Sequence, residues 1–141
     1  MAVQEGIAYW THATTPNTRY TPEYSVDLVV SDDVADSFRE RGFAIKDYEE
    51  GPALKFRRKV NGPNGMIRQA PKLLDRNKNP LDVKVGNGSK VKIQFKEWET
   101  TWQGQAFKGL DFQAMQVIDL VEFGSPDGSE FDIEEDDGDE L

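Results

Sequence analysis

Lysine side chains alternate with apolar ones between residues 89 and 99, and a tryptophan follows on the lysine side. On a regular strand Val91, Ile93 and Phe95 point one way, and the opposite face carries Lys90, Lys92, Lys96 and Trp98. Cations neutralise phosphates and rings stack on unpaired bases, so a face that mixes them suits a single-stranded nucleic acid. The alternative is an ordinary solvated strand face.

Two further segments could extend this chemistry. A strand over residues 54–60 would bury Leu54 and Phe56, place Lys55, Arg57 and Lys59 on its outward face, and leave Arg58 displaced by the pleat. Trp102, Phe107 and Lys108 lie at or just after a predicted hairpin turn. In an oligonucleotide-binding barrel, that turn is a binding loop. We therefore predict a basic and aromatic surface that binds nucleic acid.

The charge is distributed unevenly along the chain. Residues 55–108 hold thirteen Lys or Arg against four Asp or Glu, whereas residues 122–141 hold ten acidic side chains and no basic one. Blocks of like charge repel each other and stay solvated. We expect a basic body whose acidic tail competes for the same surface or docks a partner; the alternative is a tail that only aids solubility.

Enzymatic chemistry finds little support in the sequence. His12 is the only histidine, the chain has no cysteine, and no nucleophile–base constellation forms around that imidazole. The acidic tail lacks the spacing of a calcium loop, and no glycine-rich phosphate loop precedes a helix. We therefore expect no catalytic residue, no metal and no cofactor, with His12 an ordinary strand residue.

Alternating apolar residues predict most of the chain as strands. Strands are expected at residues 6–15, 24–30, 54–60 and 89–99, with a short extended piece at 71–74. The last strand, residues 105–121, would follow a turn at residues 100–105 and bury Leu110, Phe112, Ala114, Ile118 and Leu120. One helix is expected after the capping residue Ser31, with Val34, Ala35 and Phe38 as its apolar stripe and Gly42 as its end.

Five short strands, one small helix and long polar loops favour a mainly β fold of the five-stranded OB-barrel type. A β-sandwich is the competing architecture. We expect one domain over residues 1–121 and a disordered acidic tail over residues 122–141. The N-terminus lacks the pattern of a secretion signal, and no apolar run approaches the roughly 20 residues that span a membrane. These features predict a soluble intracellular protein that is not secreted.

Several segments resemble podophage-type single-stranded DNA-binding proteins, over about residues 20–141. They are the run Gly-Asn-Gly-Ser-Lys-Val-Lys-Ile at residues 86–93, the hairpin at 98–105, the strand at 109–120 before the acidic tail, and the polar turn at 75–80. The resemblance implies an OB barrel that coats single strands during phage replication, recombination and repair, in the cytoplasm of the infected host. By position, it implies DNA contacts by Lys55, Arg57, Lys59, Lys92, Lys96, Trp98 and Trp102.

The same resemblance implies that the tail docks replication proteins such as polymerase and primase-helicase, and shields the groove when no DNA is bound. It also implies self-association as a homodimer. The tail residues expected to act are Phe131, Glu134, Glu135, Asp136, Asp137, Asp139, Glu140 and Leu141. The family ends in an aromatic residue and this chain ends in Leu141, so docking would use Leu141 or the internal Phe131.

Two other functions stay open from the residues alone. An RNA-binding module of cold-shock type would carry the same cations and rings, because a preference for the 2′-hydroxyl leaves no mark in this sequence. An acidic protein that mimics DNA and inhibits a host factor would explain the tail, but it predicts no affinity for DNA. The basic block at residues 55–108 favours binding.

Overall fold

Strands make up most of the computed structural model, which describes residues 2–19 and 21–121. In chain order the elements are β1 (Ala2–Asn17), β2 (Glu23–Val29), α1 (Asp32–Glu40), β3 (Lys46–Tyr48), β4 (Gly51–Lys59), a 3₁₀ turn (Pro63–Gly65), β5 (Lys72–Leu74), β6 (Ser89–Trp102) and β7 (Gln105–Asp119). Each predicted strand is present, and the short piece near residue 72 is β5. No helix among these residues is long and apolar enough to cross a membrane.

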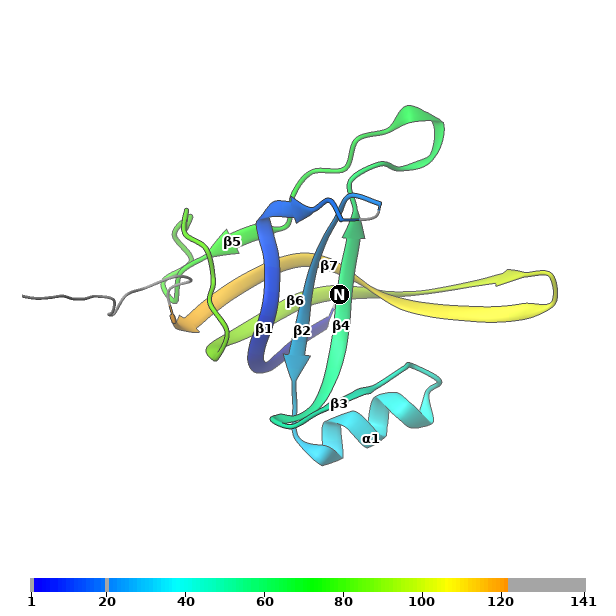
Figure 1. Ribbon diagram of the computed structural model, residues 1–141, viewed down its shortest axis with the longest axis horizontal. Coiled ribbons are helices and arrows are strands. Elements are labelled where there is room, and N and C mark those ends of the chain that lie inside the picture. Colours follow the sequence, from blue (N-terminus) through cyan, green and yellow to red (C-terminus); the bar gives the residue numbers. More distant parts are fainter. Residues whose placement is uncertain (1, 20, 122–141) are drawn as a thin grey trace, which may run out of the picture.

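Five of the strands close into a barrel (Figure 1). The first half of β1 pairs with β6 and its second half with β2, while β4 pairs with β2 and β7 with β6, all antiparallel. A parallel pairing of Arg57 on β4 with Asp111 on β7 closes the circle. The short strands β3 and β5 add to β4 and β7. The predicted OB-type barrel is therefore confirmed, and the β-sandwich is wrong.

The core lies inside the barrel and under α1. Leu54, Phe56, Val91, Ile93 and Phe95 are buried, as their alternation predicts. The helix begins at Asp32, with the Ser31 hydroxyl accepting a hydrogen bond from the Val34 amide (3.3 Å). Its buried residues are Ala35 and Phe38, and the Phe38 ring packs against Phe95 with centroids 6.1 Å apart. The helix thus covers one end of the barrel (Figure 1).

The inward face of β7 differs from the prediction beyond Phe112. Phe95 pairs with Phe112 and the preceding Gln94 with Ala114, so Gln113 is an extra residue that forms a β-bulge. A bulge shifts every later side chain to the other face. Met115 and Val117 are therefore buried, while Ala114 and Ile118 are only half-buried and Leu120 is exposed.

The β6–β7 hairpin continues far beyond the barrel. The ladder runs out to the pair Trp102 and Gln105, and the chain reverses at Gln103 and Gly104, which have φ values of 51° and 79°. Two consecutive positive φ values are those of the type I′ turn that suits a tight hairpin. All residues from 96 to 108 are exposed, and the hairpin projects as an arm (Figure 1). We call residues 96–108 the arm.

Candidate nucleic-acid interface

The outer face of β1, β2 and β4 carries cations beside carboxylates. Directly paired residues of antiparallel strands project to the same side. The register therefore forms three rows across these strands, which are Asn17–Glu23–Lys59, His12–Ser25–Arg57 and Tyr9–Asp27–Lys55. The three predicted cations of β4 thus lie in a column on one outer face.

Two of these cations are held by carboxylates of β2. The Lys55 Nζ atom lies 3.6 Å from Asp27 Oδ1, and the Arg57 Nε atom lies 3.7 Å from Glu23 Oε2. Asp27 is buried and also accepts a hydrogen bond from the Tyr48 hydroxyl. Burial, together with this bond, raises the pKa of Tyr48 to about 12, so the hydroxyl stays protonated as a donor at neutral pH. The Asp27 carboxylate therefore positions Lys55.

Three adjoining hollows form what we call the basic groove. The largest, about 500 Å³, is lined by Arg57, Arg58, Lys59, Arg68, Lys96, Trp98 and Asp111. The second is lined by Asn17, Thr21, Glu23, Arg57 and Lys59, and the third by Asp27, Ala44, Lys46, Ala53, Lys55 and Arg57. Because Arg57 lines all three, the hollows form one continuous surface along β4.

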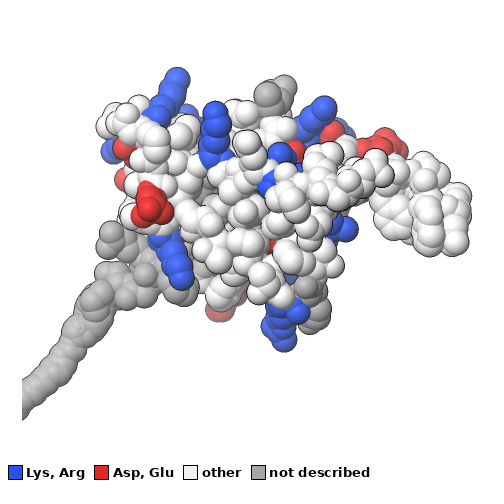
Figure 2. All heavy atoms as spheres, turned by 90° about the horizontal axis from the view of Figure 1, so that it is seen from above, with Lys and Arg blue, Asp and Glu red and all other residues white. Residues whose placement is uncertain are grey.

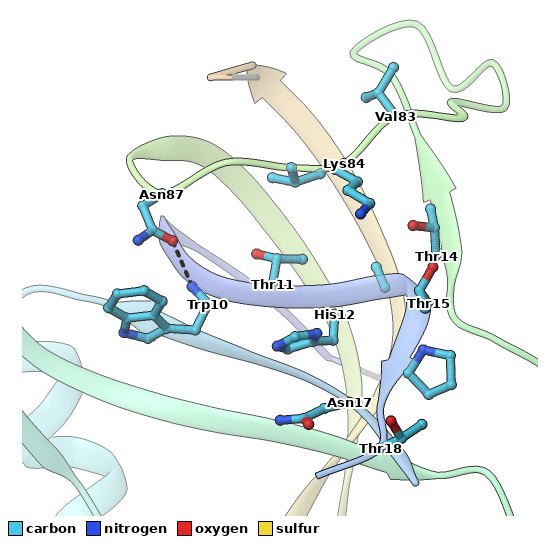
Figure 3. A pocket seen from close by; sticks show the side chains of 13 residues that line it. Trp10, Thr11, His12, Thr14, Thr15, Asn17, Thr18, Val83, Lys84 and Asn87 are labelled. Atoms are coloured by element: carbon cyan, nitrogen blue, oxygen red, sulfur yellow. Dashed lines mark hydrogen bonds between the residues drawn. The ribbon is translucent and has the colours of Figure 1, made fainter. Parts of the chain in front are cut away.

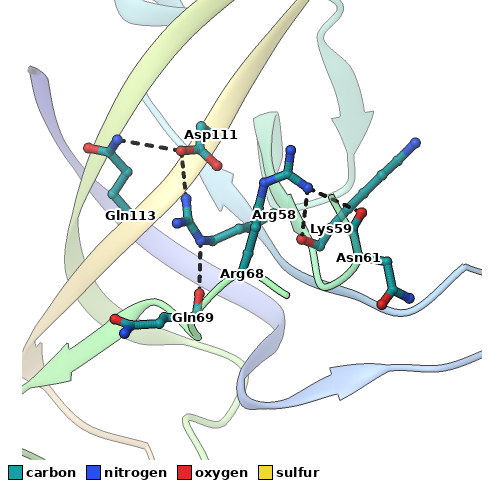
Figure 4. A network of polar contacts seen from close by, with 7 residues as sticks. All are labelled: Arg58, Lys59, Asn61, Arg68, Gln69, Asp111 and Gln113. Atoms are coloured by element: carbon teal, nitrogen blue, oxygen red, sulfur yellow. Dashed lines mark hydrogen bonds and ion pairs between the residues drawn. The ribbon is translucent and has the colours of Figure 1, made fainter. Parts of the chain in front are cut away.

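Arg58 of β4 and Arg68 of the loop that follows β4 take part in a polar network beside the end of β4 (Figure 4). The Arg58 guanidinium donates to Asp111 Oδ2 (2.8 Å) and to the carbonyl of Gln69 (2.9 Å). Arg68 donates to the carbonyls of Lys59 and Asn61. Strand alternation predicts Arg58 as displaced from the outward face, and it does not predict Arg68 as a site residue. The loop position depends on these long-range bonds, which no local pattern reveals.

One face of the arm is aromatic. Trp98 and Trp102 lie on the same side of β6, and the register places Phe107 of β7 opposite Thr100, between them. Their exposed fractions are 47% for Trp98, 66% for Trp102 and 42% for Phe107. Large apolar side chains this exposed mark interaction surfaces. We call these three residues the aromatic face, and Figure 2 shows the end of the arm without charged atoms.

The opposite face of the arm is charged and lies beside α1. The Arg41 guanidinium contacts the Glu97 carboxylate at 2.7 Å. The Lys108 ammonium donates to the carbonyl of Arg41 and lies 5.5 Å from the centre of the Phe43 ring. These contacts support the base of the arm from behind and leave the aromatic face open.

The Trp98 ring lies against the backbone of Gly109, and this contact gives a test. A Cβ atom at position 109 would come within 2.2 Å of the Trp98 ring. Gly109→Ala should therefore push the ring away, weaken single-stranded DNA binding several-fold and change the tryptophan emission, with little loss of stability because the ring is exposed. Gly109→Ala should have no further effect in a Trp98→Ala background. An equal effect in both backgrounds would mean that Gly109 acts through the backbone.

The structure brings some of the predicted site residues together and separates others. Lys55, Arg57, Lys59, Lys96 and Trp98 all line the basic groove, and Trp102 and Phe107 extend it along the arm. Lys90 and Lys92 lie instead on the outer face shared by β1 and β6, with Lys90 Nζ 3.3 Å from Glu5. Lys108 lies on the back of the arm.

The predicted tail residues lie outside the described residues. They are Phe131, Glu134, Glu135, Asp136, Asp137, Asp139, Glu140 and Leu141.

Comparison with known proteins finds the same fold in phage proteins. No protein-family model and no curated protein matches the chain. Among solved structures, gp2.5, a single-stranded DNA-binding protein of bacteriophage T7, has a TM-score of 0.66 at 13% identity, over 93% of this chain and 99% of that one. The single-stranded DNA-binding protein of bacteriophage Enc34 has a TM-score of 0.59 at 13% identity, over 86% and 82%.

A structure of the Enc34 protein in complex with single-stranded DNA also matches, with a TM-score of 0.59 at 13% identity over 85% of this chain and 86% of that one. Likeness at such low identity establishes the fold. The predicted resemblance to phage single-stranded DNA-binding proteins is therefore confirmed at the level of the fold.

Proposed function

We propose that this protein binds single-stranded DNA with little sequence preference, in the basic groove and along the aromatic face. The observation that carries the proposal is the position of Trp98, which lines the basic groove and begins the aromatic face. Cations that contact phosphates and rings that stack on bases therefore form one continuous path. Such a path binds splayed single strands and tolerates sequence, because every base has a π-face.

The geometry of the fold supports the same surface. In OB-type barrels, oligonucleotides bind across the second and third barrel strands and the loops at their ends. Here those barrel strands are β2 and β4, which carry the basic groove, and the loop between the last two barrel strands is the end of the arm. The phage proteins with this fold are described as single-stranded DNA-binding, and one was solved with single-stranded DNA.

Titration with matched oligonucleotides tests this proposal. Single-stranded DNA should bind far more tightly than the same sequence as a duplex, and should quench tryptophan emission, because stacking on Trp98 and Trp102 needs unpaired bases. A labelled single strand, followed by anisotropy, gives affinity independently of the ring signal. Equal affinity for both forms, with unchanged emission, would exclude this function.

The same titration separates the rival functions. An RNA oligomer of the same sequence should compete less well than DNA if the protein is not a cold-shock-type RNA-binding module. An acidic DNA mimic would bind neither strand. The groove favours binding over mimicry, because seven of its lining side chains are cationic: Lys46, Lys55, Arg57, Arg58, Lys59, Arg68 and Lys96.

We further propose that the protein acts in phage DNA replication and recombination in the infected host cell, and that residues 122–141 compete with DNA and dock polymerase or primase-helicase. Nine of the ten carboxylates of that segment follow Phe123. A tethered competitor has a high effective concentration, about millimolar for a short flexible linker. We also propose that the protein forms a homodimer, which sedimentation at several concentrations would test.

Truncation after Phe123 should strengthen DNA binding, most clearly at low salt. The removed carboxylates no longer compete with phosphates, and this competition fades as salt screens it over about 8 Å at physiological strength. Anisotropy at several salt concentrations measures the effect, and a full-length chain with the acidic residues after Phe123 changed to Asn or Gln is the matched control. The same truncation should abolish docking of a replication partner. Unchanged DNA affinity with intact docking would leave the tail as a solubility segment.

A further inference from the structure

Trp10 has an unusual backbone conformation and an exposed ring. Tyr9 pairs with Asp27 and His12 with Ser25, so β1 contains one extra residue between them and forms a bulge. Trp10 in this bulge has a φ of 54°, a value that a bulky residue rarely adopts. Its amide donates to Asn87 Oδ1 at 2.8 Å, and its side chain is 58% exposed. Strain that the surrounding structure maintains points to a function.

A hollow of about 430 Å³ lies beside this bulge (Figure 3). Its lining includes Trp10, Thr11, His12, Asn17, Thr18 and Lys84. This volume falls in the range of small-ligand sites. An aromatic ring, an imidazole, an amide, hydroxyl groups and a cation together offer both stacking and hydrogen bonding. The Thr11 hydroxyl is buried and has no hydrogen-bond partner among the described residues.

The backbone of β1 also contributes to this hollow. The pairing of β1 with β6 ends at Ala8. From Tyr9 to Asn17, β2 is the only described strand that pairs with β1, so the other edge of β1 has no described strand paired with it. An unpaired strand edge presents a row of amide and carbonyl groups. Asn87 already accepts a hydrogen bond from one of these amides, that of Trp10. The other backbone amide and carbonyl groups along this edge can form hydrogen bonds with the polar edge of a base.

The hollow is continuous with the basic groove. Asn17 lines both this hollow and the neighbouring one that contains Arg57 and Lys59. His12 lies in one row with Ser25 and Arg57 across β1, β2 and β4. Two strand spacings separate β4 from β1, which is roughly 10 Å. A strand that occupies the basic groove can therefore continue onto β1.

We propose that this hollow is a second nucleotide subsite, the Trp10 pocket, which receives the DNA strand where it leaves the basic groove over β2. A base stacks on Trp10, its polar edge meets Asn17 and His12, and the adjacent phosphate lies near Lys84. This inference rests on the proposed single-stranded DNA binding. It adds a contact on the side of the barrel away from the arm, so the bound strand is longer than the groove and the arm alone would accommodate.

A chain whose only tryptophan is Trp10 tests the pocket directly. In the variant Trp98→Phe, Trp102→Phe the arm keeps aromatic rings, and all tryptophan emission comes from position 10. Titration with oligothymidylates of increasing length should quench this emission only above a threshold length, while anisotropy of the labelled strands reports binding at every length. Binding of long strands without any quenching would overturn the Trp10 pocket and leave the proposed function intact.

A second pair of variants measures affinity in the parent chain. Trp10→Gly removes the ring and accepts the positive φ, so it should not lower the unfolding temperature. It should weaken binding of long strands about fivefold or more and leave short strands unaffected, whereas Trp10→Phe should keep most of the affinity. Equal affinity of Trp10→Gly and the parent for long strands would overturn the pocket. Absence of binding by the parent at every length would instead exclude the proposed function.

Discussion

Replacing Trp98, Trp102 and Phe107 together by alanine should weaken single-stranded DNA binding by at least about a hundredfold. Stacking is worth about 1 to 3 kcal/mol per base, and each 1.4 kcal/mol is a factor of ten in affinity. The three side chains lie on one face of the arm, outside the barrel core, and are 42% to 66% exposed. The triple variant should therefore fold normally, and its loss should appear in binding measured by anisotropy.

Two controls make this result specific. The variant Trp98→Phe, Trp102→Phe keeps a stacking surface and should retain most of the affinity. Thr101→Ala changes the opposite face of the same arm and should have no effect. If the triple alanine variant binds like the parent, the aromatic face does not contact the bases, and the basic groove alone accounts for binding.

Changing Arg57 and Lys59 to alanine should weaken binding at low salt by about tenfold or more, since a hydrogen bond to a charged group contributes about 1.5 to 3 kcal/mol. The slope of log K against log salt should also become shallower by about 1.4, because each phosphate contact on a single strand contributes about 0.7. Both residues line two hollows of the basic groove. Anisotropy titrations at four or more salt concentrations measure both quantities.

The matched control is the pair Lys90→Ala, Lys92→Ala, which removes the same charge from the outer face of β1 and β6. Its effect on the slope should be smaller, because this face is separated from the basic groove. An equally large effect of the control pair would show that the strand passes over β6, as the alternation of lysines in the sequence predicts.

The sequence predicts those parts of the fold that local alternation determines. The sequence predicts Leu54 and Phe56 as inward residues, and both are buried, because β4 pairs with β2 residue for residue without a bulge. The inward residues of β7 were wrong past Phe112, because the bulge at Gln113 depends on how β7 pairs with β6. The sequence predicts the hairpin but not its length. Turn residues indicate where the chain reverses, but they do not indicate how far the two strands extend beyond the barrel.

In the candidate site, too, the sequence predicts the residues that local strand alternation positions and misses those that depend on the tertiary structure. Lys55, Arg57 and Lys59 were predicted because strand period alone brings them to one face. Lys92 and Lys96 share a side of β6, yet only Lys96 lines the basic groove, because a closed barrel turns one side of a strand toward different parts of the surface. No local sequence pattern predicts Arg68 as a site residue, because the position of its side chain depends on hydrogen bonds to carbonyls seven and nine residues away.

The seam of the barrel has a consequence for how the protein opens. Arg57 pairs with Asp111 where β4 meets β7, and the neighbouring Arg58 contacts the same Asp111. A parallel meeting of two strands at one bridge has fewer ladder bonds than the antiparallel pairs around it, so amide hydrogens there should exchange with solvent by local fluctuation sooner than those of β1 and β2. Because arginines on this seam also line the basic groove, an occupied groove would suppress that fluctuation, and the rate of hydrogen exchange at β4 and β7 would depend on how much DNA is bound.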